Sequence, residues 1–190
     1  MKVFVDGCSW IEIESVKYLL QEYRFSVDYY HDDCNISADD VLIFCLGTMP
    51  TLGWASQLGI IDAILRSRGC HMIVLHPQTI PSQAVVLDSR IFSVCGALPV
   101  HLIKLMIISA IDIVLHRASL HQIQRDDIKC QESKNQIKEL MCSYNARYRS
   151  KRLGMKLKSF YGRRLMMVKS LGFNHLHHFR VFTSGVTMIP

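Results

Sequence analysis

The side chains best suited to chemistry lie toward the end of the chain, where basic residues recur and acidic residues do not. From Leu140 to the C-terminus there are ten Lys and Arg residues and no Asp or Glu. Basic side chains near a helix N-terminus suit phosphate, and arginine can bind guanine through O6 and N7. We therefore expect nucleic-acid contacts from seven residues: Lys156, Lys158, Ser159, Tyr161, Arg163, Arg164 and Lys169, the last as a phosphate clamp.

Other groups of reactive side chains are weaker candidates. His175, His177 and His178 lie close together, but only the remote Cys142 could join them, so we expect surface histidines and no metal site. The acidic residues of segment 31–40 fit a solvated loop better than a metal site. The sequence contains no Gly-rich phosphate loop and no GxSxG or HExxH motif, so we expect neither enzymatic activity nor a cofactor.

The distribution of charge predicts two units. The formal net charge of the 190 residues is +6, but residues 1–120 carry eight basic and twelve acidic side chains, whereas residues 121–190 carry fourteen and four. A front part of charge −4 followed by a back part of charge +10 indicates two domains, the second with a polyanionic partner. We place the domains at 1–116 and 131–190, with a polar linker at 117–130.

The cysteines and the N-terminus predict a cytoplasmic protein. Seven cysteines form no CxxC pair, and several lie within apolar runs, which is typical of buried, reduced thiols. Asp6 interrupts the first apolar residues, so we expect no signal peptide. The most apolar segment, residues 99–115, is short and carries charged residues, which favours an amphipathic helix over a membrane span.

The front part alternates between apolar strands and amphipathic helices. Strands are expected at residues 3–5, 25–30, 41–46, 71–75 and 91–94, and helices at 11–23, 53–68 and 99–116, with a polar loop at 31–40. Strands that lack polar alternation and are separated by helices are typical of a parallel sheet covered on both faces. The expected fold class is α/β, a doubly wound, flavodoxin-like sheet.

The back part is predicted to be all-α. Helices are expected at residues 136–142, from about 146 to 153, at 158–170 and around 176–182, with Gly154 and Gly172 as C-terminal caps of the second and third. Two helices joined by a tight, glycine-containing turn, the second of them basic and exposed, form a helix-turn-helix. The expected unit is a four-helix, helix-turn-helix domain.

The order of motifs in the front part resembles a bacterial response-regulator receiver domain. The segment DVLIFCLGTMP is similar to the receiver strand that ends in the phosphate-accepting aspartate. The resemblance implies that Cys45 stands at the acceptor position, Asp6 remains from the acidic Mg²⁺-binding pair, His76 replaces the hydroxyl residue and Cys95 replaces the lysine. Acyl-phosphate chemistry needs a carboxylate nucleophile, a divalent cation and a positive charge, so we expect a degenerate receiver that is not phosphorylated.

The back part resembles the LuxR/FixJ (NarL-type) helix-turn-helix that ends many response regulators. The resemblance is carried by RSKRLGMKLKSFYGRRLMMVKSLGF, where the segments 153–155 and 171–173 match two "LG-aliphatic" motifs of the family. Arg149 replaces a buried isoleucine of the family pattern, and Gly162 lies inside the recognition helix.

Together the resemblances imply a bacterial, nucleoid-associated transcription regulator that binds promoter DNA. In receivers the last helix often forms dimers, and residues 99–116 are apolar around most of the helix, so we expect a homodimer or an accessory heterodimer with another LuxR-type regulator. The alternative is an interaction protein that sequesters a family regulator without binding DNA. Arg149 and Gly162 favour this alternative, and the +10 charge favours the DNA-binding protein.

Overall fold

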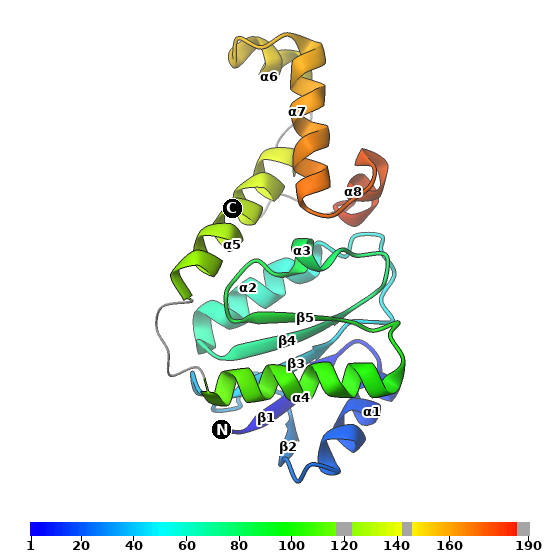
Figure 1. The fold of residues 1–190 in the computed structure, drawn as a ribbon, viewed down its shortest axis with the longest axis vertical. Coiled ribbons are helices and arrows are strands. Elements are labelled where there is room, and N and C mark those ends of the chain that lie inside the picture. Colours follow the sequence, from blue (N-terminus) through cyan, green and yellow to red (C-terminus); the bar gives the residue numbers. More distant parts are fainter. Residues whose placement is uncertain (117–122, 142–145, 186–190) are drawn as a thin grey trace.

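The computed structural model describes residues 1–116, 123–141 and 146–185, with only the backbone described for 123–129. The first unit is a five-stranded sheet, all parallel, in the order β2-β1-β3-β4-β5 (Figure 1). Its strands are β1 (Val3–Gly7), β2 (Val27–Tyr29), β3 (Val41–Cys45), β4 (His71–His76) and β5 (Ile91–Cys95). This is the strand order of flavodoxin-like folds, so the predicted α/β class is confirmed.

Helices cover both faces of this sheet. The helices α1 (Trp10–Gln21) and α4 (Val100–His116) pack on one face, and α2 (Ser56–Arg68) and the short α3 (Ser82–Val85) lie on the other (Figure 1). Side chains alternate along a strand, so Val41, Ile43 and Cys45 of β3 join the core under α1 and α4, whereas Leu42 and Phe44 join the core under α2. All five side chains are buried, which explains the unbroken apolar run.

The helix boundaries of this unit follow local signals. Ser9 caps α1, with its side chain accepting a hydrogen bond from the amide of Glu12, and Gly69 ends α2 in the left-handed conformation at φ 71°. The segment between β2 and β3 is a loop, as predicted, and its buried Asp40 accepts hydrogen bonds from Lys2 and Ser37. Among the described helices of this unit, α3 is the one that the sequence did not predict.

The second unit contains α5 (Ile123–Met141), α6 (Ala146–Arg152), α7 (Leu157–Ser170) and α8 (Leu176–Phe182). The predicted caps occur, since Gly154 and Gly172 have φ of 63° and 87°. The first helix differs from the prediction: it begins at Ile123, so residues 123–130, which we assigned to the linker, are helical. Cys142, the expected end of this helix, and residues 117–122 lie outside the described residues.

One apolar core joins the two units. The buried cluster under α2 continues into Ile137 and Leu140 of α5, Val168 of α7 and the phenylalanines of α8 and the preceding turn. Trp54, fully buried in the loop just before α2, stacks on Phe182 with a ring-centroid distance of 5.9 Å. The sequence predicted two domains with a polar linker, and did not predict a shared core.

Backbone groups strengthen this contact between the units. The amides of Gly53 and Ala55 donate to the carbonyls of Val181 and Phe182, each over 3.0 Å. The donors stand at the N-terminus of α2 and the acceptors at the C-terminus of α8, so each helix end supplies the hydrogen bonds that the other lacks. Opposite charges in the helix macrodipoles also face each other here.

None of the helices in the described part of the chain combines the length and apolar composition that a bilayer crossing needs.

Candidate nucleic-acid interface

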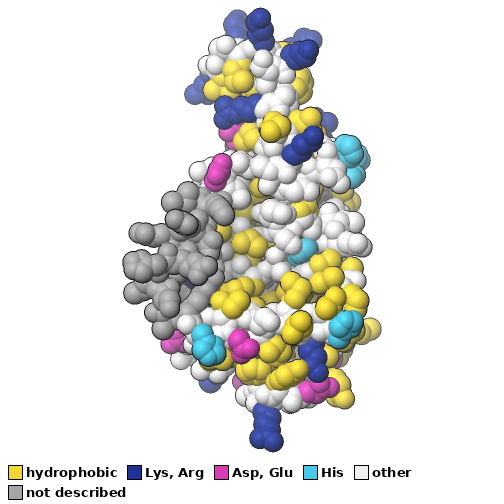
Figure 2. Space-filling model, in the orientation of Figure 1, with side chains coloured by type: hydrophobic (Ala, Val, Ile, Leu, Met, Phe, Trp, Pro, Cys, Tyr) yellow, Lys and Arg dark blue, Asp and Glu magenta, His cyan; other side chains and the backbone are white. Residues whose placement is uncertain are grey.

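The helix α7 projects from the molecule and carries most of the predicted contact residues. In Figure 1, α6 and the first turns of α7 lie at the end of the molecule remote from the sheet, and Figure 2 shows Lys and Arg side chains gathered at this end. Lys156 is the N-cap residue of α7, with extended backbone at φ −62° and ψ 141°. No acidic residue follows Glu139 in the sequence, so this end of the molecule is positively charged.

Five of the seven predicted residues are exposed to solvent on α7 or at its N-cap, and none of the ion pairs described in the structure involves them. They are Lys156, Lys158, Ser159, Tyr161 and Lys169. Lys158 and Lys169 are eleven residues apart, close to three helical turns, so they lie on one face. Their separation along the axis is about 16 Å from the helical rise, which suits contacts with phosphates on either side of a DNA groove.

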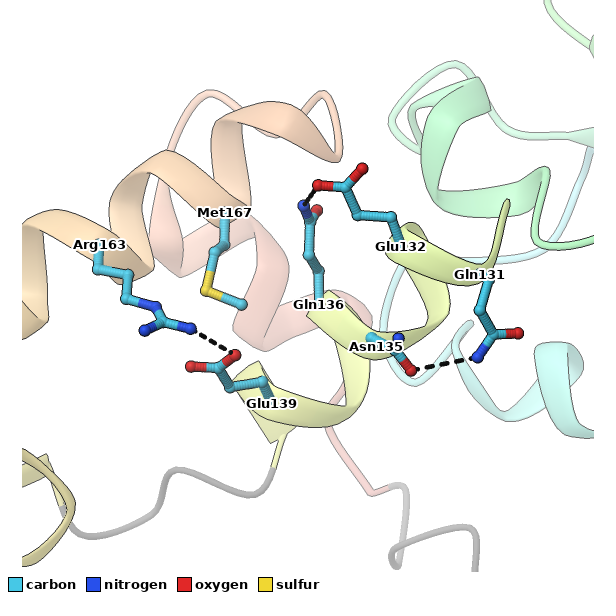
Figure 3. Close-up of a pocket in the computed structure, with 7 residues that line it drawn as sticks. All are labelled: Gln131, Glu132, Asn135, Gln136, Glu139, Arg163 and Met167. Carbon is cyan, nitrogen blue, oxygen red and sulfur yellow. Dashed lines mark hydrogen bonds and ion pairs between the residues drawn. The ribbon is translucent and has the colours of Figure 1, made fainter. Parts of the chain in front are cut away.

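Arg163 lies to the side of this face, toward α5. Its Nη2 is 3.1 Å from Glu139 Oε2, across an open groove of about 510 Å³ between α5 and α7 (Figure 3). Figure 3 shows the side chains of Asn135 and Gln136 along the α5 wall, with Met167 opposite on α7. Both partners are partly exposed, so the ion pair is weak and can exchange for a phosphate.

Arg164 does not belong to the exposed set. Its side chain is buried against α5, and Nη2 lies 3.4 Å from the carbonyl oxygen of Leu140. Burial lowers the pKa of Arg164, with a further contribution from the like charge of Arg180. The structure therefore gives Arg164 a place in the packing of α7 on α5, one helical turn after the buried Phe160.

The exposed surface of α7 contains residues that the sequence analysis missed. Leu165 and Met166 are 41% and 68% exposed, and Gly162 lies one turn before them between the two lysines. Helical spacing could have identified Leu165 and Met166, because positions 158, 162, 165, 166 and 169 share one face.

The four residues that the receiver resemblance assigns to a degenerate phosphorylation site lie at or next to the carboxyl ends of β1, β3, β4 and β5. In the register of the sheet Cys45 is paired with Gly7 and with Leu75, and His76 with Cys95, while Asp6 lies next to Gly7. Asp6, Cys45, His76 and Cys95 therefore lie along one edge of the sheet. Within the described residues no group of three His, Cys, Asp or Glu side chains could hold a metal ion.

The Cys45 thiol is fully buried, and it stays protonated. Burial raises its pKa far above the ordinary value, and the negative charges of Glu12 and Asp6 raise it further. A nucleophilic cysteine must be a thiolate, and is found in exposed, electropositive surroundings. Cys45 therefore has the environment of a structural cysteine.

His76 is neutral in this environment. Its Nδ1 lies 3.0 Å from the carbonyl oxygen of Pro77, so Nδ1 donates, and Nε2 can accept from the Ser82 hydroxyl at 3.2 Å. Burial lowers the pKa of His76, which favours the uncharged ring. This residue links the end of β4 to α3 and supplies no positive charge to the edge of the sheet.

A carboxylate that the sequence did not single out occupies this edge. Glu12 of α1 accepts a hydrogen bond from the amide of Gly47 at 3.0 Å and from the hydroxyl of Thr48 at 3.3 Å. A Cβ on Gly47 would lie 2.4 Å from Glu12 Oε1, so a larger residue here would displace the carboxylate. Burial raises the pKa of Glu12, while these hydrogen bonds oppose the shift. The amides after β3 thus bind a carboxylate of the chain itself.

The predicted surface histidines are exposed on and just before α8. The rings of His175 and His178 are 5.5 Å apart, without an acidic or sulfur ligand described beside them.

Comparisons with known proteins relate the whole chain to a response regulator by its fold. No protein-family model matches the chain, and no curated protein sequence matches it. Among solved structures, two RcsB dimers bound to two parallel DNAs give a TM-score of 0.57 at 16% identity, over 98% of this chain and 99% of that one. The complex of the two-component response regulator RcsB with DNA gives 0.55 at 16% identity, with the same coverage. At this identity the likeness shows a shared fold.

Proposed function

We propose that the protein is a bacterial DNA-binding transcription regulator that acts without phosphorylation of its receiver-like unit. The observation that carries the proposal is the exposed basic face of α7, at the end of the molecule remote from the sheet and without acidic residues in its own sequence. The helix-turn-helix would consist of α6 and α7, joined by the turn at Gly154. The fold shared with DNA-bound RcsB supports the proposal.

The contacts that we propose follow the exposed surface of α7. Lys156 and Lys158 at its N-terminus bind phosphate together with free backbone amides, and Lys169 binds phosphate at the other end. Ser159 and Tyr161 contact the groove between these positions. Arg163 joins them when it leaves Glu139, whereas Arg164 is omitted because it is buried.

Independence from phosphorylation rests on the chemistry of the sheet edge. The last residue of β3, Cys45, is a protonated thiol, the loop amides already bind Glu12, and His76 is neutral. Acyl-phosphate formation would need a carboxylate, a cation and a positive charge at this edge. We propose a regulator whose activity is set by its own concentration or by a partner.

We also propose that α4 forms a dimer contact. Leu105, Met106 and Ile113 of α4 are 61%, 40% and 45% exposed, and Figure 2 shows hydrophobic side chains gathered over this side of the sheet-containing unit. An apolar surface of this kind on a folded protein marks a contact. A second copy gives a homodimer, and another LuxR-type regulator gives an accessory heterodimer. Light scattering at several concentrations would test the homodimer, and a monomer throughout would refute it.

Genome-wide DNA capture tests the DNA-binding proposal. The variant Lys158→Ala/Lys169→Ala removes two exposed charges from α7, and Lys2→Ala/Arg66→Ala removes two exposed charges from the first unit as a matched control. We expect specific binding sites with the native protein and the control, and none with the α7 variant. Binding should also be measured over a range of salt concentrations. For the α7 variant, the slope of the logarithm of the binding constant against the logarithm of the salt concentration should be shallower, by about one unit for each lost phosphate contact. Capture of no specific site by the native protein would refute the proposal.

A second function, sequestration of another regulator, is favoured by the apolar residues near the α6–α7 turn. Leu153 and Leu157 are 51% and 36% exposed and flank Gly154 in the sequence. In this case the α7 charge variant would leave regulation unchanged, and Leu153→Ala/Leu157→Ala would abolish it. Reporter expression measured with both variants distinguishes the two functions.

A further inference from the structure

The outward face of α7 combines two lysines with an apolar centre. Lys158 and Lys169 stand at its ends, and Gly162, Leu165 and Met166 lie between them at spacings of three and four residues. Leu165 and Met166 are exposed even though α7 packs on α5 and α8 with its other side. The face therefore holds a small apolar surface bordered by positive charge.

Packing within the described part of the chain does not account for Gly162. A Cβ built at this position meets no atom within 4 Å, so an alanine would fit in free space. Glycine weakens a helix interior relative to alanine, so the residue reduces the stability of α7 without any gain in described packing. A glycine on an exposed helix face lets another molecule approach the backbone closely.

The charge around this apolar centre identifies the occupant. The segment 140–185 contains ten basic and no acidic side chains, which is complementary to a polyanion. The major groove of DNA offers phosphates at its borders and the C5-methyl groups of thymine on its floor, and apolar side chains contact these methyl groups. Of the DNA bases, thymine alone presents such a methyl group there.

We propose that Leu165 and Met166 bind thymine methyl groups in the major groove, with Gly162 allowing α7 to approach the base edges. The inference rests on the proposed DNA-binding function and adds the class of base that the helix selects. It predicts sites in which A·T pairs with thymine methyls face the middle of α7, between the phosphates bound by Lys158 and Lys169.

Replacing thymine with deoxyuridine in a selected DNA site tests the proposal, since this exchange removes the methyl group and keeps base pairing. With the full-length native protein we expect the dissociation constant to rise about fourfold for each contacted thymine replaced. The variant Leu165→Ala/Met166→Ala should bind the site more weakly and be insensitive to the exchange. Leu52→Ala, which shortens an exposed side chain in the first unit, is the control and should behave as the native protein.

Gly162→Ala provides a second test with two readouts. We expect its melting temperature to rise, because alanine favours the helix, while its dissociation constant for the selected site rises at least fivefold. Specific DNA binding that is unaffected by deoxyuridine at every thymine would overturn this inference and leave the DNA-binding proposal standing. An absence of specific DNA binding would overturn both.

Discussion

The carboxylate of Glu12 shows how single residues decide the chemistry of the sheet edge. The spacing of Ser9 and Glu12 fits a capping box, in which the carboxylate would return to the Ser9 amide. In the structure Ser9 caps the helix, but Glu12 extends to Gly47 and Thr48, 35 and 36 residues away along the chain. The sequence pattern predicts the helix start, but it cannot predict this long-range partner, because the partner depends on the packing of α1 against the sheet.

Replacing Glu12 tests its role in fixing the loop after β3. Glu12→Ala leaves the partly buried amide of Gly47 without its acceptor, so we expect the free energy of unfolding to fall by about 1–2 kcal/mol. Glu12→Gln keeps an acceptor oxygen, so the free energy of unfolding should fall by less in this variant. Glu22→Ala breaks an exposed ion pair with Lys104 and should change the free energy of unfolding much less than Glu12→Ala does. Urea denaturation checks all three, and equal effects of Glu12→Ala and Glu22→Ala would contradict the assigned role.

His76 predicts a pH dependence of stability. Its pKa is lowered in the folded protein, so below its ordinary value of about 6.5 the unfolded chain binds the extra proton first. The contribution of His76 to stability is complete above that pH and is lost as the pH falls below it, with a slope of at most about 1.4 kcal/mol per pH unit. The raised pKa values of Asp6 and Glu12 act in the opposite direction, because these groups keep protons longer when folded.

Comparison with a variant separates these effects. The free energy of unfolding of the native protein and of His76→Gln, measured between pH 5 and 8, should differ in slope below pH 6.5 and run parallel above pH 7. Parallel curves throughout would mean that His76 titrates normally in the folded protein.

At the scale of the elements, the sequence predicted every strand and most helices, because their signals are local. Apolar runs mark β3 and β4, and Gly69, Gly154 and Gly172 mark helix ends through a conformation that glycine adopts most easily. The start of α5 was missed because residues 123–130 are polar and carry no apolar stripe. The side of α7 that faces α5 was also not predicted. Arg164 was predicted to contact DNA because it is an arginine, but its place against α5 leaves it buried.

The packing of α7 on α5 predicts different roles for two neighbouring basic residues. Arg164→Ala removes a buried side chain beside Leu140, so we expect a loss of about 2 kcal/mol in stability and little change in DNA affinity below the melting temperature. Lys158→Ala should show the reverse, unchanged stability and weaker DNA binding. Thermal unfolding and fluorescence anisotropy with labelled DNA measure the two quantities. A large loss of DNA affinity with native stability in Arg164→Ala would show that this guanidinium turns outward.

At the scale of the whole molecule, the shared core makes the position of α7 depend on the first unit. The loops that leave the carboxyl ends of β3 and β4 also contact the second unit, through Trp54 against Phe182 and through Pro81 beside Gly172. The charge split in the sequence led us to predict two units, but it carries no information about how they dock. The docking of the two units depends on buried apolar residues from both of them, which a prediction of two separate domains places in separate cores.

Two glycines allow the docking to be tested with a matched control. Gly154 and Gly172 both have positive φ at the end of a helix, but a Cβ on Gly172 would lie 2.6 Å from Pro81 Cβ, and a Cβ on Gly154 would meet nothing within 4 Å. Alanine at either position costs about 1 kcal/mol for the backbone conformation. Gly172→Ala should lower the free energy of unfolding by more than this, because its Cβ also clashes with Pro81. Since the clash separates the units, Gly172→Ala should also increase the radius of gyration measured by X-ray scattering, whereas Gly154→Ala should keep the native radius. Calorimetry should then show one cooperative unfolding transition for the native protein and for Gly154→Ala, and two transitions for Gly172→Ala. Equal behaviour of the two variants would mean that the units are not held together at this contact.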